Sequence, residues 1–326
     1  MSESLPSIVV IGYNEADRLH DCLLSAAAAR DAGQAGEVIY VDGGSTDESR
    51  TIAESYHVDV VLGGSVRRSA AVNRNVGWRN AASPLVQFLD ADMVLDREWL
   101  PTATARLNAD PDCAVVCGAI HERRRSLWSR VFQLDWRRTP GPIDYCGGAA
   151  LMRRAALDAV NGFPEDVAYG EEPLLCWRIR NDVGQTIEYL DASMVVHDLA
   201  FRGFKDYWRR CKRVGETQAA IATRCWHTPD PLWRRETIRT LLWMVVYSAV
   251  LAVLVAAPVM YKAAAGGAVA FVLIRKTAQS FGAGESPVVA VLYALHTYFA
   301  KIPIAVGIVR WWLSRSRSTP DAAHNS

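Results

Sequence analysis

Short apolar runs typical of buried strands alternate with segments of helical spacing through the first 89 residues. The strand-type runs are residues 7–11, 37–41, 58–62 and 84–89, and the helical segments between them are residues 15–29, 46–56 and 67–81. This alternation is typical of parallel strands joined by right-handed crossovers. The sequence therefore predicts an α/β fold with an open, doubly wound, mainly parallel sheet, whose ligands bind at the carboxyl ends of the strands.

The composition of the 326-residue chain excludes few functions. Half of the residues are apolar, which is enough for a sizeable core. The formal charge of +1 argues against a protein that mainly coats nucleic acid, because such proteins carry a broad basic excess. The seven cysteines include no C-x-x-C pair, so we expect reduced, mostly buried thiols. The N-terminus lacks the pattern of a secretory signal, so we expect the N-terminal part to stay in the cytosol.

The last third of the chain is more apolar than the rest. Residues 240–260 carry no charge, and about 20 apolar residues are enough to span a bilayer. We therefore expect a transmembrane helix, the alternative being a core helix of a soluble protein. A second apolar stretch, residues 286–313, is interrupted by a histidine, a lysine, a proline and an arginine. The segment between them, residues 263–280, contains an arginine and a lysine, and whether it spans, re-enters or lies on the membrane surface stays open.

Arginines flank the two apolar stretches. Arg234, Arg235 and Arg239 precede the first stretch, and Arg315 and Arg317 follow the second. Because positive residues favour the cytosolic side, we expect an even number of spans, with the N-terminal domain and the C-terminus in the cytosol. The expected location is the cell (inner) membrane, with multiple passes.

Carboxylates collect after three of the predicted strands. They lie in the segment 12–15, at Asp42, and at Asp90 and Asp92. Like charges repel unless a cation lies between them. Residues i and i+2 of an extended chain point the same way, so both aspartates of the D-x-D can face one site, and carboxylate oxygens suit Mg²⁺ or Mn²⁺. The alternative is that this pair caps the following helix.

Asp42 is followed by two glycines, which allow close backbone approach to a ligand. Its carboxylate would accept hydrogen bonds from a nucleobase or ribose, or else cap the next helix. The chain contains neither G-x-G-x-x-G after the first strand nor G-x-x-x-x-G-K-[ST] anywhere, which argues against dinucleotide binding and a P-loop.

Seven segments occur in an order that resembles glycosyltransferase family 2. They are VVIGYNE, VDGGSTDES, NRNVG, FLDAD, CGGAALMRRAALDAVNGFPED, GEEPLLCWRIR and VVH, and they cover about residues 7–200. The resemblance implies the GT-A form of the α/β fold, a nucleotide-sugar donor, a divalent metal (Mn²⁺ or Mg²⁺) and inverting transfer.

The resemblance also implies a role for each matching position. The nucleotide pocket would contain Tyr13, Glu15 and Asp42; the diphosphate would meet Arg68 or Arg74; the D-x-D would be Asp90 and Asp92, with Asp92 on the metal; and the acceptor side would contain Gly147, Gly148 and Phe163. His197 matches a histidine that sometimes joins the metal site; the alternative is an ordinary histidine at a strand edge.

The catalytic base is expected in GEEPLLCWRIR. Glu172 stands where the family usually has the aspartate of an E-D pair, so the base is Glu172 or its neighbour Glu171. Adjacent residues on a helix point about 100° apart, so we expect only one of them to face the acceptor. Arg178 lies further along the same helix and is expected to steady the partner acid.

Four regions follow along the chain. We expect a GT-A catalytic domain over residues 1–200, basic aromatic interfacial helices over 201–239, membrane-associated helices over 240–313 and a polar tail over 314–326. The interfacial segment mixes aromatic rings with Lys and Arg, which suits an anionic membrane surface.

The expected partners are a nucleotide-sugar donor, a lipid-linked or saccharide acceptor and the membrane, with no nucleic acid. The absence of Q-x-x-R-W favours addition of a single sugar over processive synthesis. Three alternatives stay open: a polyprenyl-phosphate sugar synthase, a nucleotidyltransferase, and a non-catalytic membrane scaffold with a transferase-like domain.

Overall fold

The computed structural model describes residues 4–56, 58–63, 69–123, 127–198, 203–282 and 284–317. The chain divides into two compact units. The N-terminal unit comprises residues 1–124 and 136–199, and the C-terminal unit comprises residues 125–135 and 200–326. Each unit is described by itself.

The described part of the N-terminal unit contains one nine-stranded mixed sheet. Its strands are β1 (Ser7–Gly12), β2 (Glu37–Asp42), β3 (Asp59–Leu62), β4 (Leu85–Asp90), β5 (Met93–Leu95), β6 (Cys113–Glu122), β7 (Gly141–Pro142), β8 (Ala150–Arg153) and β9 (Thr186–His197). They follow the order β3-β2-β1-β4-β8-β6-β9-β5, with β7 paired to β9. The run β3-β2-β1-β4 is parallel, and β8 then pairs antiparallel to both β4 and β6.

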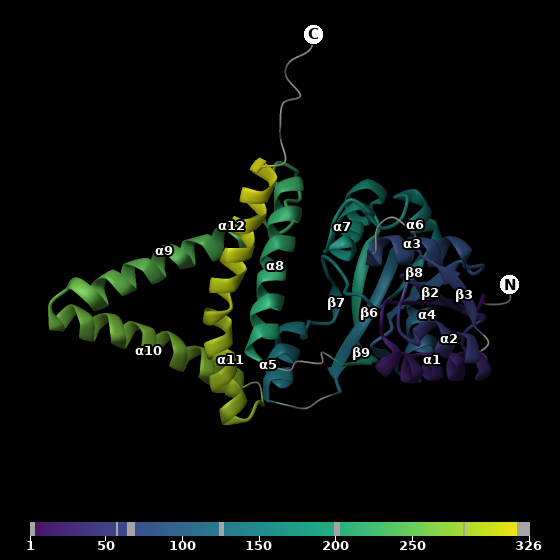
Figure 1. The fold of residues 1–326 in the computed structure, drawn as a ribbon, viewed down its shortest axis with the longest axis horizontal. Coiled ribbons are helices and arrows are strands. Elements are labelled where there is room, and N and C mark those ends of the chain that lie inside the picture. The colour runs from purple at the N-terminus through teal and green to yellow at the C-terminus, as the bar shows by residue number, and fades with distance from the viewer. Residues whose placement is uncertain are drawn as a thin grey trace, which may run out of the picture. The chain divides into compact units, whose positions relative to one another are not determined.

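Helices cover both sides of this sheet, and Figure 1 shows α1 and α3 on opposite sides. The helices of the N-terminal unit are α1 (Ala16–Asp31), α2 (Ser49–Ser55), α3 (Ala70–Asn80), α4 (Trp99–Ala109), α6 (Arg154–Ala159) and α7 (Glu171–Arg178), which a π-helical segment (Ile179–Val183) extends. The four predicted strands correspond to β1–β4, and the predicted α/β fold is confirmed. The remaining strands were not predicted.

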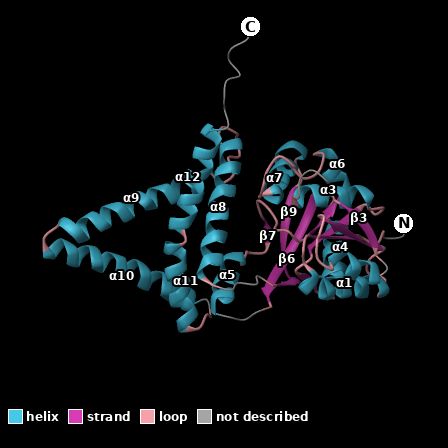
Figure 2. Cartoon of the chain, in the orientation of Figure 1, coloured by secondary structure: helices cyan, strands magenta, loops and turns pink. Residues whose placement is uncertain are grey.

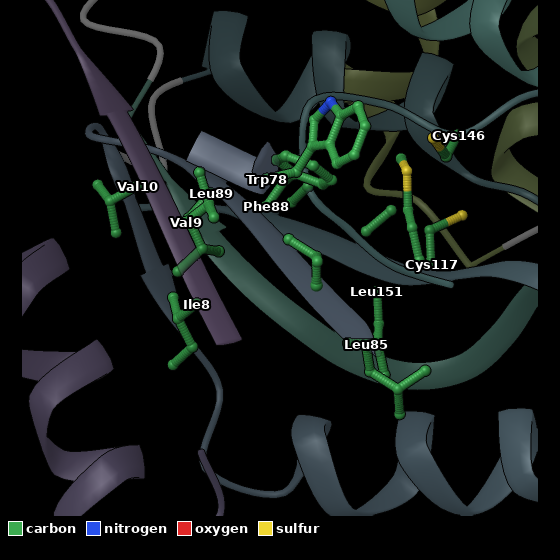
Figure 3. Packing of buried hydrophobic residues seen from close by; sticks show 14 of the residues in the cluster. Ile8, Val9, Val10, Trp78, Leu85, Phe88, Leu89, Cys117, Cys146 and Leu151 are labelled. Atoms are coloured by element: carbon green, nitrogen blue, oxygen red, sulfur yellow. The ribbon is translucent and has the colours of Figure 1, made fainter. Parts of the chain in front are cut away.

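The core lies between the sheet and these helices. Figure 3 shows Ile8 and Val9 of β1 with Phe88 of β4 among its fully buried side chains. Gly77 lets α3 pack directly on β1, because a Cβ there would overlap the Val9 side chain. All seven cysteines are free and buried, as predicted.

The described elements of the C-terminal unit are helices, as Figure 2 shows. They are α5 (Leu127–Trp136), whose last residue belongs to the N-terminal unit, and α8 (Phe204–Arg224), α9 (Arg234–Ala256), α10 (Val259–Gly282), α11 (Pro287–Phe299) and α12 (Lys301–Arg317). Two glycines let α8 and α12 approach closely. A Cβ on Gly215 would overlap the Ile304 carbonyl, and one on Gly307 would overlap the Lys212 carbonyl.

His296 interrupts the second apolar stretch but is fully hydrogen-bonded. Its Nε2 lies 2.8 Å from Asp135 Oδ2, and its Nδ1 lies 3.0 Å from the Tyr207 hydroxyl. The Tyr293 hydroxyl donates to the other Asp135 oxygen at 3.0 Å. Buried polar groups need such partners, so this network joins α5, α8 and α11 within the C-terminal unit.

Two helices among the described residues are long and apolar enough to cross a membrane: Arg234–Ala256, and Pro287–Arg315, which runs through α11 and α12. Only 6% of the apolar window in the first is buried, so this helix is not a core helix of this unit. Both agree with the stretches predicted from the sequence and indicate membrane association. The division into interfacial and membrane-associated parts stays a prediction.

Candidate active site

Several of the predicted site residues lie at one edge of the sheet. Register pairing sets Gly12 beside Asp42 and Ile11 beside Asp90, so the carboxyl ends of β1, β2 and β4 lie together. His197, at the end of β9, pairs with Met93 of β5, directly after the D-x-D segment. The topology therefore brings together side chains that are far apart in the sequence, as expected for an α/β sheet.

Asp92 lies in a small polar cluster. Its Oδ2 is 3.3 Å from His197 Nε2 and 3.5 Å from the Arg18 guanidinium. Its Oδ1 is buried and makes no hydrogen bond with the described residues. Ala91, between the two aspartates, is 2% exposed and belongs to the core, as the i, i+2 geometry predicts.

The surroundings of Asp92 favour positive charge. Burial opposes ionisation of Asp92, but hydrogen bonding to His197 and the charges of His197 and Arg18 lower its pKa. Burial alone would also lower the pKa of His197, yet Asp92 and Glu122 raise it to about 9. The Glu122 carboxylate lies 3.5 Å from His197 Nδ1.

The described residues contain no group of three or more His, Cys, Asp or Glu side chains placed to hold a metal ion. Asp92 and His197 would therefore supply at most two ligands. Mg²⁺ is commonly held by one or two carboxylates together with substrate phosphates and water. The unpartnered Asp92 Oδ1 fits such a shared site, and a metal would have to displace the proton of His197.

Arg74 is placed differently from its expected role at the diphosphate. Its side chain is 2% exposed, and Nη2 lies 2.7 Å from Asp90 Oδ1. Nη1 lies 2.6 Å from Glu171 Oε1 and 3.0 Å from Glu172 Oε1. The guanidinium is thus occupied by three carboxylates of the protein. The other candidate, Arg68, lies outside the described residues.

The two glutamates occupy the first turn of α7. Gly170 precedes them with φ +87°, a left-handed conformation that glycine adopts without strain. Pro173 follows in the first turn, where no backbone N–H is needed, and acidic residues are favourable at a helix N-terminus. The sequence alone therefore explains why a helix begins here.

Both glutamates reach the same partner, which corrects the expectation that only one faces the site. Glu171 is 8% exposed and Glu172 is 15% exposed at the side chain. Arg178 makes no ion pair with either acid in the described structure; the steadying cation is Arg74 on α3. Burial, Glu171 and Asp90 raise the pKa of Glu172, Arg74 opposes them, and the net result is a pKa of about 7.

The expected nucleotide pocket is a set of linked loops after β1 and β2. Asp42 is buried, and its Oδ2 accepts hydrogen bonds from the N–H groups of Gly44 and Ser45 at 3.0 and 2.9 Å. Asp42 therefore holds the loop after β2, and the expectation that it caps the next helix is corrected, because α2 begins only at Ser49. Tyr13 is 39% exposed, whereas Glu15 is paired with Arg18.

The acceptor-side residues are placed unequally. Gly147 is exposed, whereas Gly148 packs against the ion pair, where a Cβ would overlap Asp90 Oδ2 and lie 3.0 Å from Arg74 Nη2. Phe163 is 2% exposed and packs edge-on against Phe88 with centroids 5.1 Å apart. The Phe163 ring is therefore buried, and the acceptor-side role of this position stays a prediction.

Two site residues were missed by the sequence analysis. Arg18, on α1, pairs with Glu15, lies near Asp92 and donates to the Asp198 carbonyl at 3.0 Å. Its spacing of three residues from Glu15 on a helix was an available signal. Glu122 ends β6, a strand that was not predicted, so its position beside His197 had no sequence signal.

The N-terminal part of the chain is similar to a known family. Residues 7–160 match the family model of Glycosyl transferase family 2. The pre-mycofactocin glycosyltransferase of Mycobacterium tuberculosis is 30% identical over 204 residues, 57% of this chain and 42% of that protein. The undecaprenyl-phosphate 4-deoxy-4-formamido-L-arabinose transferase of Salmonella enteritidis is 28% identical over 168 residues, 47% of this chain and 50% of that protein. The chain matches half or less of the length of these relatives.

Solved structures agree on the fold. A mannosyltransferase from Pyrobaculum calidifontis, in complex with GDP-Man and Mn²⁺, aligns with a TM-score of 0.67 at 22% identity, over 94% of this chain and 88% of that chain. Glucosyl-3-phosphoglycerate synthase from Mycobacterium tuberculosis, in complex with Mn²⁺, UDP and glucosyl-3-phosphoglycerate, aligns with a TM-score of 0.52 at 20% identity, over 70% of this chain and 81% of that chain.

Replacing Gly148 with alanine should disturb the carboxylate cluster. The added methyl group would overlap Asp90 Oδ2, and overpacking of this kind typically costs about 1–3 kcal/mol. We expect Gly148→Ala to lower the midpoint of thermal unfolding in detergent. Gly147→Ala is the matched control, because its Cβ would meet only Ile120 Cδ1 at an ordinary 3.8 Å. Equal midpoints for the two variants would contradict the packing described here.

Proposed function

We propose that this chain, which carries a glycosyl transferase family 2 domain, is an inverting glycosyltransferase that moves a sugar from a nucleotide-sugar donor to a hydroxyl of a lipid-linked acceptor. One observation carries this proposal: an acidic residue with a pKa near neutrality, Glu172, lies at the same sheet edge as a D-x-D segment with an unpartnered carboxylate oxygen. The family match and the nucleotide-bound structural neighbours support it.

The donor would lie against the loops after β1 and β2. Tyr13 offers an exposed ring, and the Asp42 carboxylate fixes the backbone of the Gly44–Ser45 turn. These groups suit a nucleobase and ribose. The mannosyltransferase of similar fold was solved with GDP-Man, but the fold alone does not select the base or the sugar.

Asp92 and His197 would hold a divalent metal, Mn²⁺ or Mg²⁺, at the diphosphate. When bound, the metal offsets the negative charge that develops on the departing nucleoside diphosphate. Arg18 stands 3.5 Å from Asp92 and adds a fixed positive charge beside it. The Asp92 carboxylate stays ionised because its pKa is lowered.

Glu172 would act as the general base. The acceptor oxygen forms a bond to the anomeric carbon, its proton passes to the Glu172 carboxylate, and the nucleoside diphosphate leaves with the electron pair of the broken bond. Attack opposite the leaving group inverts the anomeric centre. A pKa near 7 suits this transfer, because about half of the carboxyl groups are ionised at neutral pH and the carboxylate still accepts a proton.

A lipid-linked acceptor fits a chain with membrane-associated helices. One relative is named for transfer to undecaprenyl phosphate, and two helices of this chain are able to cross a bilayer. A lipid phosphate as the direct acceptor would make the enzyme a polyprenyl-phosphate sugar synthase, and a lipid-linked saccharide would make it an assembly transferase. The size of the labelled saccharide released by mild acid separates the two: a monosaccharide for a lipid phosphate acceptor and an oligosaccharide for a lipid-linked saccharide acceptor.

Transfer should require a divalent metal and Asp92. Purified protein is incubated with radiolabelled nucleotide sugars and a bacterial lipid extract, and label is followed into the organic phase. We expect transfer with Mn²⁺ or Mg²⁺, and none with excess chelator or in Asp92→Asn, since an amide supplies no charge to offset the metal. Full turnover by protein verified to be metal-free would contradict the role of the metal. No transfer from any donor would contradict the proposed function.

Replacing Glu172 should remove the base. We expect Glu172→Gln to reduce turnover by about 10²–10⁴-fold, with nucleotide-sugar affinity retained. Turnover corrected for folded, donor-binding protein is the deciding measurement. If Glu171→Gln is the damaging change instead, the base is the other glutamate; if neither change matters, the pair only stabilises the helix N-terminus.

The same base predicts a pH dependence. A carboxylate accepts a proton only when ionised, so kcat/KM should fall as the pH drops through about 7, the value to which the pKa of Glu172 is raised. The groups that face Glu172 are Glu171, Arg74, Asp90 and the buried thiol of Cys146. A profile that is flat from pH 5 to 8 would be inconsistent with this role. In Glu172→Gln, the fall of kcat/KM on the acid side of the profile (the acid limb) should disappear.

The chain should stay in membranes after alkaline carbonate, with the N-terminal unit in the cytosol. All native cysteines are buried, so introduced cysteines report topology. We expect Asp31→Cys, at a 70% exposed side chain, to react with an impermeant maleimide only after permeabilisation. Met260→Cys, beyond the first candidate span, should react in intact cells. The reverse pattern, or release by carbonate, would overturn this arrangement.

A further inference from the structure

One buried guanidinium serves three carboxylates that come from two different elements. Arg74 is 2% exposed and projects from α3. One of its terminal nitrogens binds Asp90 at the end of β4, at 2.7 Å, and the other binds the two glutamates that open α7, at 2.6 and 3.0 Å. The D-x-D segment and the glutamate pair therefore share a single cation.

The shape of the side chain fixes the spacing of its partners. A guanidinium is planar, always charged and presents its N–H groups in a rigid fork. Because Nη1 and Nη2 bind partners on different elements, the fork sets the distance between β4 and the N-terminus of α7. A lysine ammonium carries the same charge but is a single point on a flexible stem.

Arg74 is itself held in place by its surroundings. Its guanidinium lies 5.6 Å from the centre of the Phe163 ring. Asn75, the next residue of α3, fixes Phe163 by exchanging hydrogen bonds with its backbone N–H and carbonyl, both at 2.8 Å. The backbone of Gly148 closes the other side of the Asp90–Arg74 pair. These contacts hold the Arg74 guanidinium in one position.

We propose that Arg74 is a positioning residue that holds Glu172 ionised and at a fixed distance from Asp90, and that it does not touch the substrate. This inference rests on the proposed function, because it takes Glu172 as the base. Two adjacent glutamates in a buried site would not both be ionised without a cation. Arg74 is the cation that both of them contact.

The alternative role for Arg74, contact with the donor diphosphate, makes a different prediction. Loss of a diphosphate contact would weaken donor binding. Loss of a positioning cation would leave donor affinity intact, reduce kcat and move the acid limb of the pH profile. The direction of that movement follows from charge. Burial, Glu171 and Asp90 raise the pKa of Glu172, and Arg74 lowers it. Removing Arg74 should therefore move the acid limb to higher pH.

The test compares Arg74→Gln and Arg74→Lys with matched changes at Arg106. Arg106 also binds two carboxylates, Asp110 at 2.8 Å and Glu188 at 2.5 Å, but at the opposite end of β9 from His197. We expect Arg74→Gln to move the acid limb upward by about 1–3 pH units and to reduce turnover at pH 7 by roughly 5- to 500-fold. Arg74→Lys should keep the limb near its original pH but lose kcat. Arg106→Gln and Arg106→Lys should change neither.

Glu171→Gln provides a second test with the opposite sign, should Arg74→Gln fail to fold. The charge of Glu171 raises the pKa of Glu172, so its removal should move the acid limb to lower pH. An infrared titration of carboxyl protonation, with the Glu172 signal identified by its loss in Glu172→Gln, reports the same movements without turnover.

The outcomes separate the two proposals. If Glu172→Gln keeps normal turnover, the proposed base is wrong whatever Arg74 does. If Glu172→Gln is inactive but the acid limb of the pH profile stays in place in Arg74→Gln and in Glu171→Gln, the positioning role is wrong. Weakened donor binding in Arg74→Lys with an unmoved limb would assign Arg74 to the diphosphate instead.

Discussion

The repulsion between carboxylates at one sheet edge is the constraint on which the site depends. Glu171 and Glu172 are largely buried from water, Asp90 is 33% exposed at its side chain, and all three bind the same guanidinium. Breaking a buried ion pair by removing one partner typically costs about 3–5 kcal/mol, because a charge is left uncompensated. The chain meets this constraint with Arg74, placed where all three anions reach it. The position of α3 on the sheet is therefore tied to the charge balance of the site.

A second group of charges is balanced separately. Asp92 lies beside Arg18 and His197, and Glu122 lies on the far side of the imidazole. The raised pKa of His197 means that, without a metal, the imidazole itself supplies positive charge to this group. A divalent cation at Asp92 would replace the charge of that proton. The base and the proposed metal site thus have separate counter-charges, although Asp90 and Asp92 are only two residues apart.

The sequence predicted the parallel strands of the sheet and their shared edge better than the side-chain contacts at that edge. Strands β1 to β4 follow continuous apolar runs, and the edge where their carboxyl ends meet follows from parallel topology. The later strands were not predicted because β5, β7 and β8 are short and because the pairing of the longer β6 and β9 contains register shifts, so their patterns overlap with those of loops and helices. Glu122 was missed for this reason, since its position depends on β6.

Arg74 and Phe163 are more buried than the sequence indicated. Arg74 belongs to NRNVG, a polar segment that looks exposed in sequence, yet the helix directs it under the D-x-D. Phe163 is in a segment expected at the acceptor, but Asn75 anchors its backbone and its ring packs on Phe88. Side-chain reach and solvent access are tertiary properties, so a motif gives the neighbourhood of a residue and not the group that it touches.

The proton affinity of Glu172 follows from competition between burial, the neighbouring acids and Arg74. Burial and two neighbouring acids disfavour its charge, whereas Arg74 favours it, and the balance brings its pKa to about 7. A glutamate without the arginine would be protonated at neutral pH, and one without the neighbouring acids would be a weaker base. The longer side chain at this position, compared with the aspartate usual in the family, still reaches Arg74 at 3.0 Å. Because the same guanidinium binds Asp90, the placement of the base and the placement of the donor-side carboxylate are set by one side chain.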